Sequence, residues 1–430
     1  MDFNEPLHTY LRKSVIYEVN IRQFTKEGSF TSFQKYLPRL KKMGVTIIWL
    51  MPIHPIGKKN RKGTLGSYYS IKNHYEVNPE FGTKENFKNL ISDIHTLGMK
   101  VIIDWVANHV SCDHEWSVTH PSYFIKNQSG EYLPAFDWLD VIQINHQNED
   151  AHNAMIEAMC YWVHEFDIDG FRADLAHLTP LSFWKKSKCR TESIKPNLIW
   201  LAETEDFSFF DVFDIIYTWK WMHLTESFFK EHNVSIDNLI KELQYHITAR
   251  GEDKFYLFFT SNHDENSWNG TEYEKYGVYA KGLAVLSFLF QPSVPLIYSG
   301  QEIPNYRRLS FFEKDEIDWS PENKLFDFYK RLAVIRQQYA SGQVLHFIKI
   351  DQKILAYKSE SSAGVYYFFF NMDQIDFLLQ PVYVNHNVSL YDEINKVYID
   401  LNVGNQKLLS PGEFLVINTK TSVNNTDVFV

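Results

Sequence analysis

The feature that most constrains the fold is a repeated alternation between short apolar runs and segments with helical periodicity. Several helical segments stop at a glycine, as at Gly44 and Gly98. Strands that alternate with helices in this way build parallel sheets. The expected strands are 15–21, 45–50, 101–105, 170–175, 198–202, 214–217, 256–260 and 295–298, and the expected helices are 33–43, 86–97, 151–166, 236–248, 279–290 and 324–338. Eight such strands are the number that a closed barrel needs.

The alternation breaks down in two places. Residues 110–145 are irregular and rich in aromatic and polar side chains, which is typical of a functional loop or a small inserted domain. After Tyr339, short alternating runs follow without a long helix, which indicates an antiparallel β-domain. We therefore expect an α/β protein with three parts. They are a (β/α)8 TIM barrel over 1–109 and 146–340, an inserted domain B after the third strand over 110–145, and a C-terminal β-sandwich over 341–430.

The amino-acid composition limits the kinds of binding partner that we expect. The formal net charge is −10, with 43 Lys and Arg against 53 Asp and Glu, so nucleic acid is not an expected partner. The basic run 58–62 is short, and we interpret it as a solvated loop. Three cysteines give neither a disulfide framework nor a CxxC zinc pair. No apolar run is long enough to span a membrane, and residues 1–12 lack a signal-peptide core, so no membrane partner and a cytoplasmic location are expected.

Polar and acidic side chains follow the expected strands at four points. In a parallel barrel these positions face one common mouth. An acid inside an apolar run is costly unless function or ion pairing retains it, and for a single Asp the ion pair is the commoner reason. Four such positions at matching strand ends indicate one shared site. The residues are Asp104, Asn108 and His109 after the third strand, Arg172 and Asp174 in the fourth, Glu203 after the fifth, and Asn262, His263 and Asp264 after the seventh.

These segments resemble the four signature regions of the α-amylase superfamily, glycoside hydrolase family 13. The matching stretches are 104–109, 170–174, Glu203 and 262–264, supported by 49–52, 69–70, 77–83 and 295–302. The motifs occur in the family's order over about residues 16–319. The resemblance implies a retaining α-glucan hydrolase that cleaves α-1,4-glucosidic bonds of starch-derived substrates or maltooligosaccharides through a covalent glucosyl-enzyme.

The resemblance also implies roles for single residues. Asp174 would be the nucleophile, Glu203 the acid/base and Asp264 the stabiliser of the transition state. The substrate-binding residues implied are Tyr69, Asp104, His109, Arg172, His177 and His263. Arg172 would hold Asp174 ionised and oriented at neutral pH, and it would form an ion pair with Asp104 inside the barrel. Tyr69 would stack on the central glucose, with the neighbouring Tyr68 as the competing candidate.

The sequence departs from the family pattern at two points. His177 and Leu178 stand where many members carry a Lys-His pair, so His177 is a candidate contact to the next sugar. Gln143 occupies the position of an Asp that helps to bind calcium in many members. Asn108 remains as a candidate ligand, but one neutral oxygen is far from the six to eight that calcium takes. We therefore expect no required cofactor and a weak or absent calcium site.

Two alternatives stay open at this stage. A transglycosylase on the same fold would pass the glucosyl group to a sugar instead of water, using the same catalytic residues. A non-catalytic relative that only binds carbohydrate or a partner would usually lack one of the acids, whereas Asp174, Glu203 and Asp264 are all present. Endo or exo action, α-1,4 or α-1,6 preference and oligomeric state are not predicted.

Overall fold

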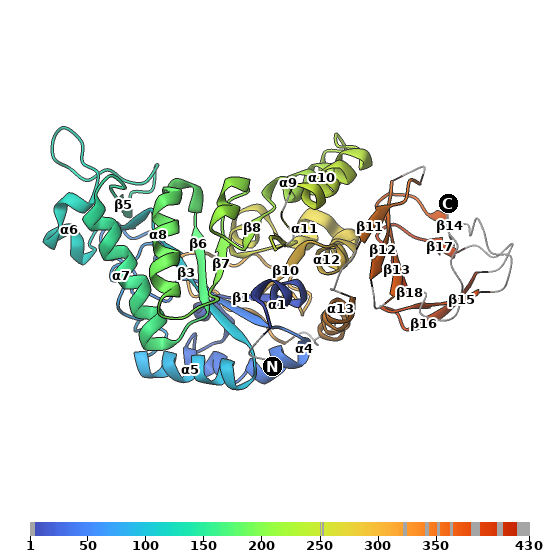
Figure 1. Ribbon diagram of the computed structural model, residues 1–430, viewed down its shortest axis with the longest axis horizontal. Helices are drawn as coiled ribbons and strands as arrows, with labels where there is room; N and C mark the ends of the chain where they lie inside the picture. Colours follow the sequence, from blue (N-terminus) through green and yellow to red (C-terminus); the bar gives the residue numbers. More distant parts are fainter. Residues whose placement is uncertain are drawn as a thin grey trace.

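The molecule consists of a barrel with a small insertion at one end of its long axis and a β-domain at the other, as the computed structural model in Figure 1 shows. The structure describes residues 5–249, 251, 253–320, 325–339, 344–350, 353–361, 364–379, 388–401 and 407–418. The expected first residues of a helix at Lys324 and of a strand at Gln343 lie outside the described residues.

Eight parallel strands close into a barrel, in the order β1, β10, β9, β8, β7, β6, β3 and β2. Their side chains are almost entirely buried because both faces of the sheet are covered. The expected (β/α)8 barrel is thus confirmed. The strands are β1 (Ile16–Val19), β2 (Ile47–Leu50), β3 (Lys100–Val106), β6 (Gly170–Asp174), β7 (Ile199–Ala202), β8 (Ile215–Tyr217), β9 (Phe255–Phe258) and β10 (Ser293–Tyr298).

Helices surround the barrel, and local sequence signals set several of their ends. Helix α5 begins at a capping box formed by Thr83 and Asn86, and α4 ends at Gly44, whose φ is 101°. The α-helices are α1 (Leu7–Lys13), α2 (Ile21–Phe24), α3 (Phe30–Gln34), α4 (Leu37–Met43), α5 (Lys84–Thr96), α7 (Glu149–Phe166), α8 (Leu181–Glu192), α9 (Trp219–Lys230), α10 (Ile236–Thr248), α11 (Glu272–Tyr276), α12 (Ala280–Leu289) and α13 (Phe326–Tyr339). Short helical turns are η2 (Ala176–Leu178), η3 (Phe207–Asp211), η4 (Glu265–Asn269) and η5 (Gly277–Tyr279).

The helix predicted over 33–43 is wrong in one respect, because two helices, α3 and α4, share this region. Pro38 lies in the first turn of α4. A proline has no N–H to donate, so it is tolerated in the first turn of a helix and breaks a helix interior. Helices α8 and α9 were not predicted, although both flank strands that were.

The inserted segment after β3 is small but partly regular. Strand β4 (His109–Ser111) pairs antiparallel with β5 (Val141–Gln143), and between them lie α6 (Glu115–Thr119) and η1 (Pro121–Tyr123). The hydroxyl of Ser70, from the loop after β2, donates to the carbonyl oxygen of Asp140 at 3.0 Å. The segment is therefore anchored to the barrel at the side where the strands end.

The C-terminal part forms an antiparallel sheet in the order β11, β12, β13, β18, β15 and β16, beside a second pair, β14 and β17. The antiparallel architecture expected for this part is confirmed. It packs on the barrel's α12, where the Tyr366 hydroxyl donates to the carbonyl of Leu289 at 2.9 Å. The strands are β11 (Val344–Phe347), β12 (Ile354–Ser361), β13 (Gly364–Asn371), β14 (Phe377–Leu379), β15 (Val388–Asp392), β16 (Val397–Leu401), β17 (Lys407–Leu409) and β18 (Phe414–Asn418).

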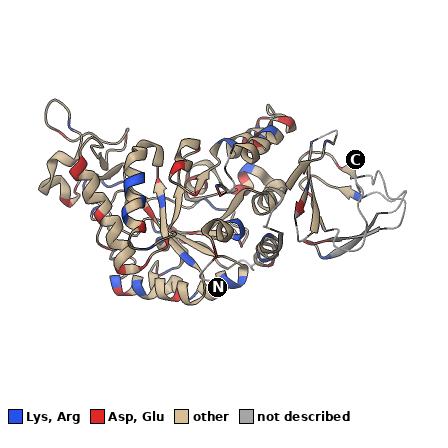
Figure 2. Ribbon diagram, in the orientation of Figure 1, with Lys and Arg blue, Asp and Glu red and all other residues tan. Residues whose placement is uncertain are grey.

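Charged side chains of both signs alternate over the outer helices, and few lie on the barrel strands (Figure 2). In the described part of the chain, no helix combines the length and the apolar character needed to cross a membrane.

Candidate active site

A cavity of about 470 Å³ opens where the barrel strands end, and it brings together residues from distant parts of the sequence. It contains all three acids predicted to be catalytic. The residues lining it are Lys62, Ser67, Tyr69, His109, Asp137, Trp138, Asp140, Val141, Asp174, Leu175, Glu203, Asp264, Trp268, Phe311 and Phe312.

Strand β6 begins with a glycine, and a side chain at that position would clash with the backbone of the neighbouring strand. Gly170 has a φ of 151°, and a Cβ atom built there would lie 2.0 Å from the carbonyl oxygen of Ile199 on β7. This close approach allows β6 to pair with β7 in register, with Arg172 opposite Leu201 and Ala173 opposite Ala202. The strand then ends at Asp174, whose carboxylate reaches the cavity.

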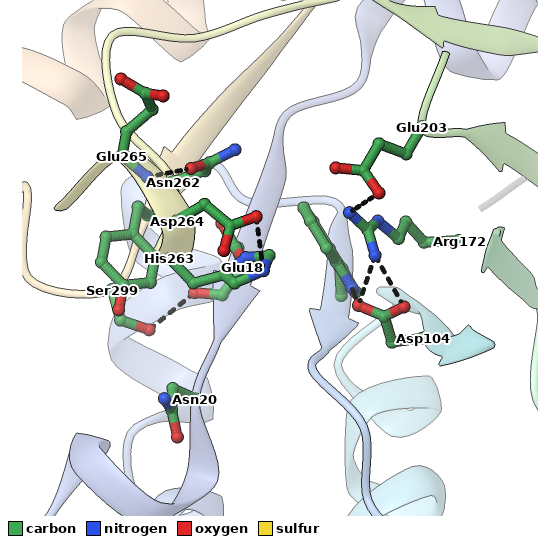
Figure 3. A network of polar contacts seen from close by, with 12 residues as sticks. Glu18, Asn20, Asp104, Arg172, Glu203, Asn262, His263, Asp264, Glu265 and Ser299 are labelled. Carbon is green, nitrogen blue, oxygen red and sulfur yellow. Dashed lines mark hydrogen bonds and ion pairs between the residues drawn. The ribbon is translucent and has the colours of Figure 1, made fainter. Parts of the chain in front are cut away.

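Arg172 lies at the centre of a cluster of three carboxylates. Its Nη1 donates to one oxygen each of Asp104 and Asp174, both at 2.9 Å, and its Nη2 lies 2.9 Å from Oε2 of Glu203. Figure 3 shows the bridge from Asp104 through Arg172 to Glu203. The predicted ion pair of Arg172 and Asp104 is present, and the same guanidinium also holds both acids at the cavity.

The two cavity acids are consequently close to each other. The terminal nitrogens of one guanidinium are roughly 2.3 Å apart, so the two oxygens that they hold are separated by at most about 8 Å. Glu203 is also fixed by the backbone N–H of Leu175, which donates to its Oε2 at 2.8 Å. Leu175 adopts a left-handed conformation with a φ of 41°, a costly geometry for a residue with a side chain. The strained turn after Asp174 thus aims a backbone donor at Glu203.

Burial and neighbouring charges shift the pKa values of the acids around Arg172. Burial raises the pKa of Asp174 well above its ordinary value, and Glu203 and Asp104 act in the same direction, while Arg172 opposes the shift. Burial likewise raises the pKa of Asp104 to about 6 against the effect of Arg172. The contact between Arg172 and Asp174 is present, but the expectation that it holds Asp174 ionised at neutral pH disagrees with the raised pKa of this carboxyl. One positive charge is too little for three enclosed carboxylates, so the cluster favours retaining a proton.

His263 connects this cluster to Asp264. Its Nδ1 lies 2.5 Å from Oε1 of Glu18, and its Nε2 lies 2.7 Å from the Tyr69 hydroxyl and 3.3 Å from Oδ2 of Asp264 (Figure 3). Burial alone would lower the pKa of His263, but Asp264 and Glu18 outweigh it and raise the pKa to about 9. The imidazole is therefore protonated at neutral pH and donates from both nitrogens.

Of the two candidate stacking tyrosines, Tyr69 lines the cavity. Its hydroxyl donates to Asp104 at 3.1 Å, and its ring stacks on His263 with centroids 5.5 Å apart. Tyr68 lies beneath Arg22, whose guanidinium sits 4.3 Å from its ring centroid, and it does not line the cavity. The geometry therefore favours Tyr69 for contact with a bound sugar.

The remaining predicted residues are placed differently. His109 is buried in the cavity wall, where burial lowers its pKa to about 4, so it is neutral and its ring packs edge-on against Trp138. His177 is exposed on η2 and does not line the cavity, so its predicted contact to a sugar stays a prediction.

Asn108 was the one candidate metal ligand, and it is buried with both polar side-chain atoms unpartnered. Its orphaned amide oxygen fits one position of a calcium shell. Among the described residues, however, no group of three or more His, Cys, Asp or Glu side chains could hold a metal ion. A hard cation that takes six to eight oxygens does not fit this set.

Sequence reasoning missed two parts of the site. Glu18, a buried acid inside the apolar strand β1, is the partner of His263, and it carries the same signal that identified the other acids. The aromatic side chains that line the cavity, Trp138, Trp268, Phe311 and Phe312, come from loops with no distinctive local pattern.

Comparison with known proteins agrees with this geometry. The family model "Alpha amylase, catalytic domain" matches residues 23–134. A curated relative, "Alpha-amylase 2" of Dictyoglomus thermophilum, is 25% identical over 409 residues, which is 84% of this chain and 69% of that protein. The solved structure of an α-amylase from Lactobacillus plantarum superposes with a TM-score of 0.86 at 26% identity, covering 95% of this chain and 99% of that one. The chain is therefore similar to α-amylases in sequence and in fold.

A second solved structure, described as a noncanonic maltogenic α-amylase from Thermotoga neapolitana, has a TM-score of 0.85 at 29% identity, with 95% of this chain and 99% of that one covered. Both structural matches extend through the barrel and the C-terminal sheet. The matches to α-amylases identify the chain as a glycoside hydrolase, with the acid cluster at the barrel mouth as its candidate active site.

Proposed function

We propose that this amylase-like enzyme hydrolyses α-1,4-glucosidic bonds of maltooligosaccharides and starch-derived glucans by double displacement. Asp174 attacks the anomeric carbon and forms a glucosyl-enzyme, while Glu203 gives its proton to the leaving oxygen. Glu203 then takes a proton from water, which attacks the same carbon and releases Asp174. The sugar leaves with its anomeric configuration retained.

The observation that carries this proposal is that one guanidinium holds both acids. Arg172 contacts Asp174 and Glu203 at 2.9 Å each, which keeps them within the range that glycosidic cleavage needs. Arg172 stays fully charged and orients both groups.

Three further residues complete the proposed machinery. Asp264 is the most exposed of the three acids proposed to be catalytic, with 38% of its side chain accessible, and it can accept hydrogen bonds from hydroxyl groups of a bound ring. Tyr69 offers an aromatic face, and His109 offers a neutral imidazole in the wall. Together they give hydrogen bonds and stacking to one pyranose, which is the substrate chemistry that the cavity fits.

The proposal is tested with Asp174→Asn and Glu203→Gln on maltoheptaose. Loss of the nucleophile should lower kcat by several orders of magnitude. Glu203→Gln should fail on maltoheptaose but release a rapid first-turnover burst of fluoride from α-maltosyl fluoride, because fluoride leaves without a proton. Hydrolysis of the resulting glycosyl-enzyme should then be slow, since the variant has no base to activate water. Wild-type activity on maltoheptaose with unchanged activity of Asp174→Asn would refute the mechanism.

Product analysis decides between hydrolysis and the transglycosylase alternative. The early products should be shorter than the substrate, and their anomeric form, followed by proton NMR, should be α. Products longer than the substrate would show that a sugar, not water, receives the glucosyl group. Inverted anomers would contradict the double displacement.

A further inference from the structure

Three histidine side chains, here called the histidine cluster, meet where the inserted segment joins the barrel. His54 and His74 belong to the loop after β2, and His114 directly precedes α6 in the inserted segment. At most 2% of each of these residues is exposed. None of the three lines the active-site cavity, and the proposed mechanism uses none of them. Buried titratable groups outside the site are costly unless their contacts have a role of their own.

Hydrogen bonds determine which nitrogen of each ring carries a proton. Nδ1 of His114 accepts from the backbone N–H of Trp116 at 3.0 Å, so the proton of this ring lies on Nε2. That Nε2 is 3.0 Å from Nδ1 of His74, which must therefore accept. Nδ1 of His54 lies 3.1 Å from the carbonyl oxygen of Glu76 and donates to it. The pattern is complete when all three imidazoles are neutral.

Tryptophan rings surround the histidine cluster. His74 stacks on Trp116 with ring centroids 5.3 Å apart, and Trp105 lies 5.7 Å from His54 and 5.3 Å from His74. Helix α7 contributes Trp162, whose indole N–H donates to the carbonyl oxygen of His74 at 2.6 Å. The cluster thus connects the loop after β2, strand β3, helix α7 and the inserted segment in one apolar environment.

Burial lowers the pKa of all three rings. It lowers the pKa of His54 to about 4 and that of His114 to about 3, where His54 acts in the same direction and Asp113 opposes it. Burial also lowers the pKa of His74 well below its ordinary value, and the two neighbouring imidazoles add to this, against the backbone of Val106. The folded protein therefore keeps the cluster neutral well below pH 6.5.

A second cavity, of about 690 Å³, gives protons a route to the cluster because His114 forms part of its wall. The charged side chains that line it are Lys59, Asp113 and Glu115. The carboxylate of Asp113 lies 3.8 Å from Lys72, and that of Glu115 accepts from the Asn73 amide at 2.8 Å. Both acids thus have partners of their own.

A proton added to either ring of the hydrogen-bonded pair breaks a contact. If His74 gained a proton at Nδ1, two donors would face each other across 3.0 Å. If His114 gained one at Nδ1, the N–H of Trp116 would lose its acceptor, and α6 would lose the cap of its first turn. The contact between the barrel and the inserted segment therefore depends on neutral imidazoles.

We propose that the histidine cluster is an acid-sensitive latch that holds the inserted segment, residues 110–145, on the barrel. When the segment opens, its imidazoles return to an ordinary pKa near 6.5 and bind protons that the closed state excludes. Opening therefore becomes more favourable as the pH falls below 6.5. Because Trp138 and Asp140 of this segment line the active-site cavity, acid removes one side of that cavity and neutral pH restores it.

Hydrogen exchange of the backbone amides in 110–145, followed by mass spectrometry at pH 7 and pH 5, measures the opening constant after correction for the intrinsic exchange rate. Each imidazole that is neutral when closed and has a pKa of 6.5 when open raises this constant about 25-fold between the two pH values. For His74 and His114 together the rise is about 600-fold. Peptides from β7 should show no comparable rise, because the barrel stays folded.

Two substitutions remove single proton sites. His74→Asn keeps an acceptor opposite His114, so the opening constant at pH 7 should stay close to that of wild type, while its rise towards pH 5 should be about 25-fold smaller. His114→Asn keeps a side chain that can cap α6 but loses the contact to His74. It should open more readily at pH 7 and respond less to acid.

The matched control is His164→Asn, which replaces an exposed histidine of α7 that pairs with Glu165. It should respond to acid as wild type does. His109 and the hydrogen-bonded pair His146 and His152 also lie at the ends of the segment, and they remain in every variant. The difference between variants therefore reports on the histidine cluster alone.

An equal rise in His74→Asn and wild type would overturn the proposal. A rise shared by the β7 peptides would do the same, because acid would then unfold the whole barrel. An NMR titration of the wild-type imidazoles needs no variant to fold: His74 and His114 should stay neutral down to pH 5 while the segment is closed. Titration of either ring near pH 6.5, with the amides of 110–145 still protected, would show that there is no latch.

Discussion

Glu18 and His263, 245 positions apart in the sequence, face each other across 2.5 Å at the base of the candidate active site. Glu18 is fully buried on β1, and its second carboxylate oxygen has no hydrogen-bond partner among the residues that the structure describes. Its single described partner is therefore the imidazole of His263, which reaches Asp264 and Tyr69 with its other nitrogen. The pair fixes the charge and the orientation of a ring at the edge of the cavity.

Glu18→Gln should make the enzyme less stable at neutral pH and less sensitive to alkaline pH. The pKa of His263 is raised from 6.5 to about 9 in the folded state, where Asp264 and Glu18 raise it and burial and Arg172 lower it. A raised histidine pKa contributes stability that is complete below pH 6.5 and is lost as the pH rises through 9. The variant should lose roughly 1–3 kcal/mol at pH 6.5, and the difference from wild type should shrink towards pH 9.

Chemical denaturation at several pH values measures this effect. Glu149→Gln removes an exposed carboxylate that pairs with Lys186, and it should leave the stability close to that of wild type at every pH. Parallel pH profiles for Glu18→Gln and wild type would contradict the assignment. Because His263 would contact the substrate, kcat/KM on maltoheptaose should fall in Glu18→Gln as well.

Asp174→Asn should increase stability while it abolishes turnover. Burial raises the pKa of Asp174 in the folded state, so its ionisation opposes folding as the pH rises above 3.8 towards the raised value. An amide of the same shape can still accept from Arg172 without adding a third negative charge. We expect a gain of roughly 0.5–2 kcal/mol at pH 7, seen as a higher Tm. A lower Tm would mean that the Arg172 bridge outweighs burial.

The candidate site was predictable where its chemistry interrupts an apolar run. Asp174 ends β6, Glu203 directly follows β7 and Asp104 lies near the end of β3, and the strand ends of a parallel barrel must converge. Glu18 gives the same signal inside β1. It was missed because the search followed strand ends, whereas Glu18 lies within its strand and reaches His263 from there.

Other features depend on contacts that the sequence does not encode locally. Trp138 and Trp268 stand in short segments without a distinctive pattern, and only closure of the barrel brings the segments after β3 and β9 to one cavity. Only four residues of helix α8 are buried, so its apolar stripe is weak. Periodicity therefore did not predict this helix. Tyr69 could be preferred to Tyr68 as the residue that contacts the sugar only once the structure showed Arg22 lying over the ring of Tyr68.

Arg172→Lys should reduce both activity and stability. Arg172 places two nitrogens on three carboxylates, and it also donates through Nε to the Tyr217 hydroxyl at 3.3 Å. A single ammonium cannot reproduce this fork, and acids left without a partner in a buried site are costly. We expect a loss of roughly 3–5 kcal/mol in unfolding free energy and a fall in kcat of at least about 100-fold.

The control is Arg190→Lys, which changes an exposed arginine that pairs with Glu157 on the barrel surface. It should leave the Tm and kcat close to wild type. Near-normal kcat in Arg172→Lys would show that orientation of Asp174 and Glu203 does not depend on the bidentate group. A normal Tm with low kcat would place its role in catalysis alone.

Chelation should leave activity on maltoheptaose unchanged. Asn108 provides one buried amide oxygen, and the described residues around it include no cluster of acids that would complete a calcium shell. The measurement is kcat/KM and Tm after dialysis against EDTA, with and without added calcium. Asn108→Ala removes the orphaned amide, and it should not change the response to calcium. Inactivation by EDTA that calcium reverses, together with its loss in Asn108→Ala, would establish a calcium site at this position.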